Sequence, residues 1–502
     1  MVKPAILLSL IIWSSLLAEA GMIQGITLEN FTGLPLARAR LTLERLEGDR
    51  LKPVATVTAA RDGRFAFGPL EEGYYQLSAV RPGFAQGRYG QRRNGGPGSA
   101  VFVSREGVQF VELRLKRLGL VTGRTLDENL VGLPGVPVFA YTTGVPMRIV
   151  ASATSDDLGV YRITGLPFGK FLIRTGSAQL DDSFNLLPTY HPFSSTLLRD
   201  ARSVVVELDG ETPNVNVQPI AGSLASLAVA VTGCLGVAQV TLSSNTGRKQ
   251  VTAPCNLEAV VFHALAPGEY EILAEGEADR QKLAAFTFLQ LDASRREIGL
   301  ALRPLVDFRV RLADGAGPAI ENAGVIVRRR DLAGEGPDVA VTSDRVALTP
   351  GFWQITARPP AGSYLADVKV DAGGYRRTRR DPNPEWFEFW LDSPIQANVS
   401  LSSQPAQLSG HVSAGGKGAI FAPVYLVPTT AQARRRMNGP RVTRTDVSGN
   451  YRFDGLAPGT YLVLSSLDVT EISEEALAEG AQTIKIGEGR SGTQDLVLYQ
   501  LP

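Results

Sequence analysis

Stretches in which apolar and polar residues alternate recur along the chain after residue 20, and glycine- and proline-rich turns separate them. The clearest apolar pairs are Phe65 and Phe67, Tyr161 and Ile163, and Tyr451 and Phe453. Alternation places every second side chain on one face of a strand, whereas the periodicity of an amphipathic helix is nearly absent. Many short strands between regular turns indicate an all-β protein built of antiparallel β-sandwiches.

One signature occurs five times: leucine, two variable residues, glycine, one variable residue and an aromatic residue. The five occurrences are Leu70 to Tyr75, Leu166 to Phe171, Leu265 to Tyr270, Leu348 to Trp353 and Leu456 to Tyr461. Their leucines are 96, 99, 83 and 108 residues apart, and removing 20 N-terminal residues from 502 leaves 482, or about 96 per copy. Motif count and length therefore agree on five tandem copies.

Two kinds of turn recur among the copies. In three copies proline precedes the glycine of the signature, which predicts a type II turn, because proline presets φ and glycine accepts a positive φ. Upstream, Asp62, Asp156 and Asp446 stand shortly before a glycine, where a carboxylate caps a turn. Calcium-binding loops are the alternative, but they need further carboxylates at alternating positions, so we expect turn chemistry.

The copies also open alike, with Gly25, Gly123 and Gly410 inside the first expected strand. With the Asp-x-x-Gly-x-Tyr and Leu-x-Pro-Gly-x-Tyr turns, this pattern resembles the carboxypeptidase regulatory-like domain. The resemblance implies a seven-stranded transthyretin-like (prealbumin-like) sandwich, a fold grouped with carbohydrate-binding-like folds, in a domain that does no chemistry itself. Residues 88–92 and 188–192 are also similar to segments of exported multi-repeat proteins of soil bacteria such as acidobacteria.

Five domains follow from this register. Copies 1, 2 and 5 match the pattern well, whereas copy 3 lacks the Asp/Gly turn at residues 255–258 and copy 4 lacks a glycine turn before Leu348. The expected divisions are a signal peptide at 1–20 and sandwich repeats at 21–117, 118–220, 221–304, 305–405 and 406–502.

The N-terminus predicts export. A short cationic start precedes a thirteen-residue apolar run, Ala5 to Leu17, and Ala18-Glu-Ala20 supplies small residues at the positions that a signal peptidase recognises. A membrane anchor is the alternative, but thirteen residues fall short of the ~20 that span a bilayer. The long uncharged stretch at 212–247 is expected to form buried strands, so we expect no membrane span after cleavage near Ala20.

Composition narrows the possible functions. The formal net charge is +1, from 51 basic and 50 acidic residues, so nucleic acid is not expected as a partner. The three histidines lack a His-x-x-Glu pair, and the chain has neither a Gly-x-Ser-x-Gly elbow nor a phosphate-binding loop. We therefore expect no catalytic residues, no metal site, no cofactor and no enzymatic activity.

Both cysteines fall in copy 3. By strand register Cys234 lies in the turn after the first strand and Cys255 in the turn before the fourth, and these turns share one end of a sandwich. The sequence therefore predicts a disulfide, which would contribute about 3 kcal/mol in the chain-entropy model. Two buried free thiols are the alternative, which export makes less favourable.

Copy 4 contains a strand that is apolar on both faces. Trp386, Glu388 and Trp390 lie on one face, and Phe387, Phe389 and Leu391 on the other. Either the first face packs against a neighbouring domain, the interpretation we favour, or it is exposed and binds sugar rings by stacking and carboxylate contacts.

Arginine clusters occur at residues 88–93, 328–330, 376–380 and 434–436, each in an expected loop. Solvated loop charge is the favoured interpretation, and contact with an anionic surface polymer is the alternative. Together these features predict an exported, non-catalytic structural or adhesive scaffold, a semi-rigid stalk at the bacterial periphery. The alternative is a carbohydrate-binding protein that uses copy 4, with glycans or other cell-envelope proteins as partners.

Overall fold

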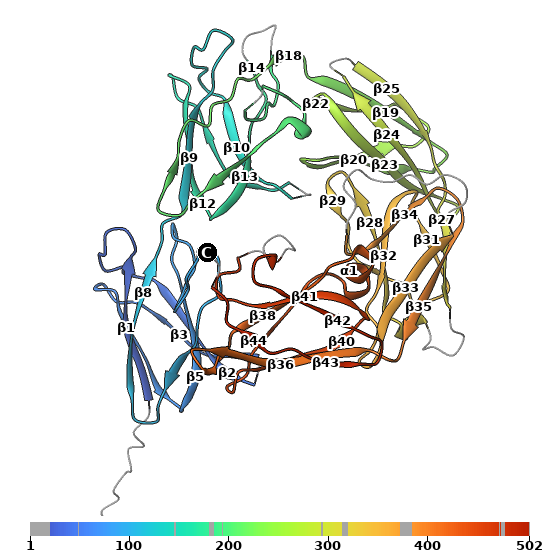
Figure 1. Cartoon of the computed structure of the whole chain (residues 1–502). Helices are drawn as coiled ribbons and strands as arrows, with labels where there is room; N and C mark the ends of the chain where they lie inside the picture. Colours follow the sequence, from blue (N-terminus) through green and yellow to red (C-terminus); the bar gives the residue numbers. More distant parts are fainter. Residues whose placement is uncertain are drawn as a thin grey trace, which may run out of the picture.

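A computed structural model describes residues 21–500, except 49, 145–146, 180–184, 193, 293–294, 314–319, 372–383, 471 and 473–476. The expected signal peptide at 1–20 and the arginine cluster at 376–380 lie outside the described residues. The chain forms five β-sandwiches in tandem, which confirms the predicted fold class. The array does not extend as a stalk: it curves back so that the last sandwich lies beside the first (Figure 1).

Sandwich 1 shows the common plan. Its opening strand β1 pairs antiparallel with β4 and parallel with the closing strand β8, and the facing sheet has the order β3-β2-β5-β6, with β7 also paired to β5. The strands are β1 (Gly21–Glu29), β2 (Arg40–Glu47), β3 (Arg50–Thr58), β4 (Arg64–Leu70), β5 (Gly73–Val80), β6 (Gly87–Arg88), β7 (Val101–Val103) and β8 (Val108–Leu115).

Sandwich 2 repeats the plan with sheets of order β12-β9-β17 and β11-β10-β13-β16, and β14, β15 and β18 add a small third sheet. Its strands are β9 (Gly119–Arg124), β10 (Pro137–Thr142), β11 (Ile149–Thr154), β12 (Val160–Leu166), β13 (Gly169–Thr175), β14 (Ala178–Gln179), β15 (Asn185–Leu186), β16 (Ser203–Val206), β17 (Glu211–Thr212) and β18 (Ala221–Gly222), with a 3-10 turn η1 at Leu198–Asp200.

Sandwich 3 has sheets of order β22-β19-β25 and β21-β20-β23-β24-β26. Its strands are β19 (Ala225–Thr232), β20 (Val237–Ser244), β21 (Gly247–Pro254), β22 (Val260–Leu265), β23 (Gly268–Ala278), β24 (Gln281–Leu291), β25 (Arg295–Ala301) and β26 (Arg303–Pro304).

Sandwich 4 departs from this plan, because β33 joins the sheet that contains the first strand, β27. That sheet has the order β31-β27-β35-β33, and the facing sheet has the order β29-β28-β32-β34. Its elements are β27 (Val306–Leu312), η2 (Ile320–Asn322), β28 (Val325–Asp331), β29 (Gly334–Glu335), β30 (Val339–Ala340), β31 (Arg345–Leu348), β32 (Gly351–Ala357), β33 (Tyr364–Asp371), β34 (Phe387–Leu391) and β35 (Ile395–Ser402).

Sandwich 5 pairs β36 with β37, β40, β43 and β44, opposite a sheet of order β39-β38-β41-β42. Its elements are β36 (Ala406–Ala414), β37 (Lys417–Gly418), β38 (Pro423–Pro428), α1 (Ala431–Met437), β39 (Arg441–Arg444), β40 (Asn450–Leu456), β41 (Gly459–Ser465), β42 (Gln482–Ile486), β43 (Ser491–Thr493) and β44 (Leu496–Val497).

The five-fold signature joins two strands in every copy. Its leucine is buried at the end of one strand, and its glycine begins the next, as at Leu70 and Gly73. The aromatic residue is buried as well, and where it has a polar atom it donates a hydrogen bond to the carbonyl oxygen four residues earlier. These bonds run from Tyr75 to Glu71 (2.7 Å), Tyr270 to Ala266 (2.7 Å), Trp353 to Thr349 (2.8 Å) and Tyr461 to Ala457. The aromatic residue thus fills the core and closes the turn.

The predicted type II turn is wrong. Such a turn needs φ near +80° at its glycine, but φ is +136° at Gly351 and +159° at Gly268. The glycine of the signature is already the first residue of a strand, so the chain is more extended there than in a type II turn.

The aspartate turns are confirmed. Asp156 accepts hydrogen bonds from the backbone N–H groups of Leu158 (3.0 Å) and Val160 (2.8 Å), and Gly159 has φ of +74°. Asp446 accepts the equivalent pair in sandwich 5, both at 2.8 Å. A single carboxylate therefore closes each turn through local hydrogen bonds.

In sandwiches 1, 2 and 5, close packing requires the glycine inside the opening strand. A Cβ atom on Gly25, Gly123 or Gly410 would lie 2.1, 2.0 or 1.9 Å from a carbonyl oxygen of the closing segment. In sandwiches 2 and 5 a buried tyrosine, Tyr161 or Tyr451, also donates its hydroxyl to that segment's backbone. The closing segment can thus lie directly against the opening strand.

Each sandwich has its own apolar core. The five principal clusters are each formed by residues of one sandwich, with one exception: Tyr364 of β33 is buried in the core of sandwich 5. No helix in the described part of the chain is long and apolar enough to cross a membrane.

Candidate functional site: the junctions between sandwiches

The histidines do not come together. His191, His263 and His411 lie on three different sandwiches, and His191 Nδ1 and His411 Nε2 contact backbone carbonyl oxygens at 2.8 and 3.0 Å. Among the described residues there is no group of three or more His, Cys, Asp or Glu side chains placed to hold a metal ion.

The face with Trp386, Glu388 and Trp390 is covered in the structure. Trp386 is 6% exposed, and the guanidinium of Arg328 lies 3.9 Å from the centre of its ring. Glu388 accepts hydrogen bonds from Arg330 (2.7 Å) and Gln354 (2.7 Å). The three side chains therefore do not form an open platform for a sugar ring.

Trp390 lies in an aromatic cluster between sandwiches 3 and 4. Its ring centre is 5.5 Å from that of Phe286, 5.8 Å from that of Phe288 and 5.0 Å from that of Phe352. Phe286 and Phe288 point outward from β24, whereas Phe352 and Trp390 lie on adjacent strands of sandwich 4. The outer faces of the two sandwiches thus pack against each other, which is the interdomain alternative considered for this strand.

A buried ion pair lies in the same junction. Asp331 at the end of β28 is 2% exposed and binds both Nε and Nη2 of Arg248 from sandwich 3, each at 2.8 Å. Ser243 of sandwich 3 donates a third bond (2.8 Å), and the N–H of Ala333 a fourth (2.9 Å). A bidentate, fully bonded carboxylate offsets the cost of removing its charge from water.

Arg329 extends this network. Its Nη1 lies 3.7 Å from Asp331, and its guanidinium lies 5.1 Å from the ring centre of Phe286. Burial lowers the pKa of Arg329, while Asp331 and Glu271 act in the opposite direction. The contact between sandwiches 3 and 4, here called junction 3–4, therefore combines stacked aromatic rings with buried charged side chains.

The expectation that the arginine clusters lie in loops is wrong for two of them. Residues 328–330 belong to β28 and residues 434–436 to helix α1, and both elements lie at junctions. Arginine combines a long apolar stem with a planar charge, so it suits a packed interface as well as a solvated loop.

Helix α1 connects sandwiches 4 and 5. Thr430 caps its N-terminus by accepting a bond from the Ala433 N–H (3.2 Å), and Asn438 ends it with φ of +54°. The Asn438 side chain bonds Thr356 of β32, and Arg435 lies over the ring of Phe387 at 5.5 Å. The end of the helix is thus fixed to the preceding sandwich.

A second contact between sandwiches 4 and 5 (junction 4–5) involves Glu488. It accepts hydrogen bonds from Tyr364 (2.9 Å) and Ser402 (2.6 Å) of sandwich 4. The bonds from Ser402 and Tyr364 lower the pKa of Glu488, so the carboxylate form is favoured there.

Sandwiches 1 and 2 meet through Asp209, which has φ of +58°. It accepts hydrogen bonds from the Asn30 side chain (2.9 Å) and from the backbone N–H of Arg117 (2.6 Å), while Arg117 also pairs with the buried Glu29. Because β1 and β8 are parallel, the segments that follow them lie at one end of sandwich 1, and Asp209 is bonded to both segments.

Sandwiches 5 and 1 also contact each other. Arg92 Nη1 of sandwich 1 lies 4.0 Å from Asp468 Oδ2, and a Cβ on Gly96 would lie 3.3 Å from the carbonyl oxygen of Leu467. Burial lowers the pKa of Arg444, and Arg88 of sandwich 1 adds to that effect. The arginine-rich segment 88–93 thus contacts the far end of the chain.

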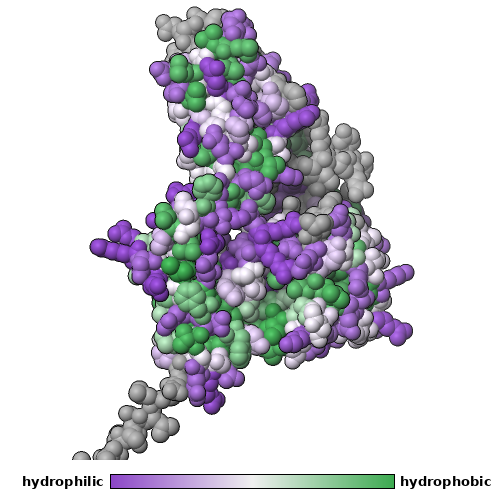
Figure 2. All heavy atoms as spheres, turned by 60° about the vertical axis from the view of Figure 1, so that its left-hand side comes forward, coloured by the Kyte–Doolittle hydropathy of each residue, from purple (hydrophilic) through white to green (hydrophobic). Residues whose placement is uncertain are grey.

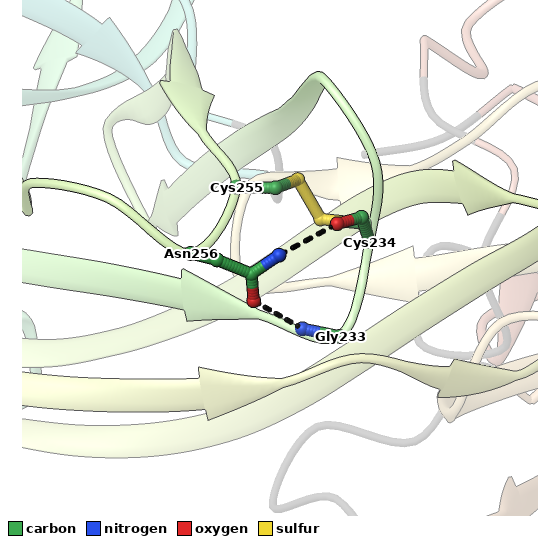
Figure 3. Close-up of a disulfide and its surroundings, with 4 residues drawn as sticks. All are labelled: Gly233, Cys234, Cys255 and Asn256. Atoms are coloured by element: carbon green, nitrogen blue, oxygen red, sulfur yellow. Dashed lines mark hydrogen bonds between the residues drawn. A yellow bond between two sulfur atoms is a disulfide. The ribbon is translucent and has the colours of Figure 1, made fainter.

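A disulfide joins Cys234 and Cys255 in sandwich 3 (Figure 3). Both cysteines are buried, with 2% and 6% of their surface exposed, and they lie in the turns that follow β19 and β21. Asn256 supports the bridge, since its side chain donates to the Cys234 carbonyl (2.8 Å) and accepts from the Gly233 N–H (3.0 Å).

Sequence reasoning did not identify Phe286, Phe288 or Asp331. The signal for the two phenylalanines was present, because β24 is apolar on both faces: Leu283, Leu289 and Leu291 enter the core of sandwich 3, whereas the phenylalanines point outward. Asp331 had no comparable signal, since an aspartate at the end of a strand is usually a turn residue.

The surface seen in Figure 2 carries apolar residues dispersed among polar ones. Some exposed apolar side chains, such as Phe31 (81%) and Leu130 (64%), lie in loops, and others, such as Val108 (60%) and Phe110 (58%), lie on β8. Single exposed apolar residues are normal on soluble proteins and do not mark an interface.

No protein-family model matches the chain, and no curated protein matches it. Among solved structures, the Bacillus anthracis TIE protein is 17% identical over 57% of this chain, with a TM-score of 0.19. The minor pilin of Streptococcus agalactiae is 15% identical over 40% of this chain and 95% of its own length, with a TM-score of 0.26. The major pilin subunit of Bacillus cereus is 12% identical over 56% of this chain and 99% of its own, with a TM-score of 0.16.

The match with the TIE protein covers 51% of that protein, so this chain spans about half of its length. These identities and TM-scores carry no conclusion about the activity or partners of this chain.

Proposed function

We propose that this protein is an exported, non-catalytic scaffold at the bacterial cell periphery, in which five sandwiches are held in a curved array. The observation that carries the proposal is that each sandwich has its own apolar core, while surface side chains bond neighbouring sandwiches at the contacts between 1 and 2, 3 and 4, 4 and 5, and 5 and 1. Junction 3–4 shows this most fully, with four aromatic rings and the Asp331–Arg248 pair. Such a chain places its loops in a defined arrangement, as a structural or adhesive scaffold requires.

Membership of the carboxypeptidase regulatory-like family is part of this proposal. Its support is the recurrence, in sandwiches 1, 2 and 5, of an aspartate turn followed by the leucine–glycine–aromatic signature. Carbohydrate binding by Trp386, Glu388 and Trp390 has less support, because Arg328, Arg330 and the aromatic cluster occupy that face.

Expression of the full chain with its own N-terminus in a bacterial host tests export. We expect a mature protein that begins near Gly21, identified by mass spectrometry of its N-terminal peptide, in the envelope or medium fraction. A chain that keeps Met1 and stays in the cytoplasm would contradict export.

Deletion of the gene in the source bacterium tests the scaffold role. We expect altered surface attachment or envelope integrity, restored by the complementing chain. Turnover of peptide or glycoside substrates by the purified protein, lost in a point variant, would overturn the non-catalytic assignment.

A further inference from the structure

A cavity of about 750 Å³ lies between sandwiches 2 and 3. Its walls come from η1 and the segment before it, from β13, and from the β20–β21 and β22–β23 turns. Leu332 of sandwich 4 also contributes to the lining. A cavity of this size accommodates a small organic ligand, and sites of this kind are frequent between domains.

The charged residues in this wall are mostly basic. Arg174, Arg199, Arg248 and Lys249 line the cavity, and Glu269 is the single carboxylate among the described lining residues. Arg248 is neutralised by Asp331 in junction 3–4. Arg199 lies 3.9 Å from Asp200. Arg174 and Lys249 therefore stand against one lining carboxylate, Glu269, so an anion is favoured over a cationic ligand.

Arg174 is less exposed than Arg199, Arg248 and Lys249. Its Nε atom is buried and has no hydrogen-bond partner among the described residues, although its guanidinium lies 5.1 Å from the ring centre of Tyr190. Burial raises the pKa of Tyr270, another lining residue, to about 12, and the positive charge of Arg174 acts in the opposite direction. A buried donor without a partner is costly and is typically satisfied by a ligand or solvent.

The rest of the lining suits a polyhydroxylated ligand. Ser244, Asn245 and Thr246 form a polar turn on one side, and Tyr270 and Leu197 supply apolar surface. Hydroxyl and amide groups bond sugar hydroxyls, while an apolar face packs against the C–H groups of a sugar ring.

We propose that this cavity binds an acidic saccharide of about two rings, with its carboxylate or sulfate group placed against Arg174 and Lys249. This inference does not depend on the scaffold role and concerns a different surface from the tryptophans of sandwich 4. A hydroxyl of a neutral sugar can also accept a hydrogen bond from Arg174, but only an anionic group offsets the guanidinium charge, so the site favours an acidic sugar.

Isothermal titration of the mature full chain with three disaccharides tests the site: a diuronate, a sulfated disaccharide and a neutral disaccharide such as cellobiose. We expect an acidic disaccharide to bind about ten-fold or more tightly than cellobiose, and its affinity to fall with added salt. A preference for the diuronate indicates a uronic-acid polymer, and a preference for the sulfated sugar indicates a sulfated one. Equal binding of cellobiose, or no acidic binding at millimolar concentration, would overturn the proposal.

Two variants locate the site. Arg174→Gln and Lys249→Gln should each weaken acidic-sugar binding about ten-fold, and the exposed Lys249 can be replaced without loss of core packing. Arg64→Gln, a 70% exposed arginine on sandwich 1, is the matched control and should bind as the parent does. Unchanged affinity in Lys249→Gln and in a folded Arg174→Gln protein would refute the cavity as the site.

Discussion

Junction 3–4 and the contact between sandwiches 5 and 1 both join neighbours in space, but they are built differently. Junction 3–4 has a carboxylate with two 2.8 Å bonds to one arginine and four aromatic rings within 6.1 Å of a neighbouring ring. The 5–1 contact includes an ion pair at 4.0 Å whose arginine is 41% exposed. It also brings Arg88 close to Arg444, two like charges.

This difference indicates which neighbouring sandwiches of the curved array are held in one arrangement. Buried, doubly bonded pairs and stacked rings stabilise one arrangement, whereas an ion pair at 4.0 Å with a 41% exposed arginine contributes less. We therefore expect sandwiches 3 and 4 to act as one rigid unit, and the closure between sandwiches 5 and 1 to open readily. Variants at Asp331, Trp390 and Arg92 and at the two cysteines test this contrast.

Asp331→Ala should be the most damaging change. It leaves Arg248 and Arg329 partly buried without their carboxylate, and loss of one partner of a buried pair typically costs about 3–5 kcal/mol. Urea unfolding monitored by tryptophan fluorescence measures the loss. Asp454→Ala removes an exposed pair with Arg452 and should change stability by less than about 1 kcal/mol; equal losses in the two variants would remove the contrast.

Replacing both cysteines by alanine separates stability inside sandwich 3 from stability of its junction. The bridge closes a loop with a sequence separation of 21, for which the chain-entropy model gives about 3 kcal/mol. We expect a lower urea midpoint but an unchanged small-angle scattering profile in native buffer. A changed profile would show that the disulfide also sets the position of sandwich 4.

Trp390→Ala should loosen junction 3–4 with the core of sandwich 4 intact. The side chain is half-buried, so we expect about 2–3 kcal/mol, less than the ~3–5 kcal/mol of a fully buried tryptophan. Hydrogen exchange should increase in β24 and β32. Phe110→Ala, which removes a 58% exposed ring from β8, is the control, and equal exchange in both variants would contradict the assigned packing.

Arg92→Ala should have the smallest effect on stability and a visible effect on shape. We expect less than about 1 kcal/mol, because the pair is long and partly exposed. The radius of gyration from small-angle scattering should rise, and high salt should produce the same rise in the parent protein. Arg64→Ala within sandwich 1 is the control. A radius unchanged by Arg92→Ala and by salt would show that other contacts close the array.

Much of the fold was accessible from the sequence because its determinants are local. The leucine–glycine–aromatic signature marks five strand junctions, and Asp156 and Asp446 close their turns with backbone groups two and four residues away. The type II turn was a wrong inference from Pro-Gly, because strand pairing extends the glycine. The arginines of β28 and α1 were misplaced because arginine composition does not distinguish a loop from a packed face.

The repeat, the strands, the inward face of each strand and the register that places both cysteines at one end of sandwich 3 could all be derived from the amino-acid sequence. Alternation shows which side chains enter a sandwich's own core, and this information lies within a few residues. Three features could be found only in the folded chain: Trp390 contacts Phe286, the array curves until Arg92 reaches Asp468, and Arg174 lines a cavity. These contacts depend on the angles between sandwiches, which are set by packing between residues far apart in the chain.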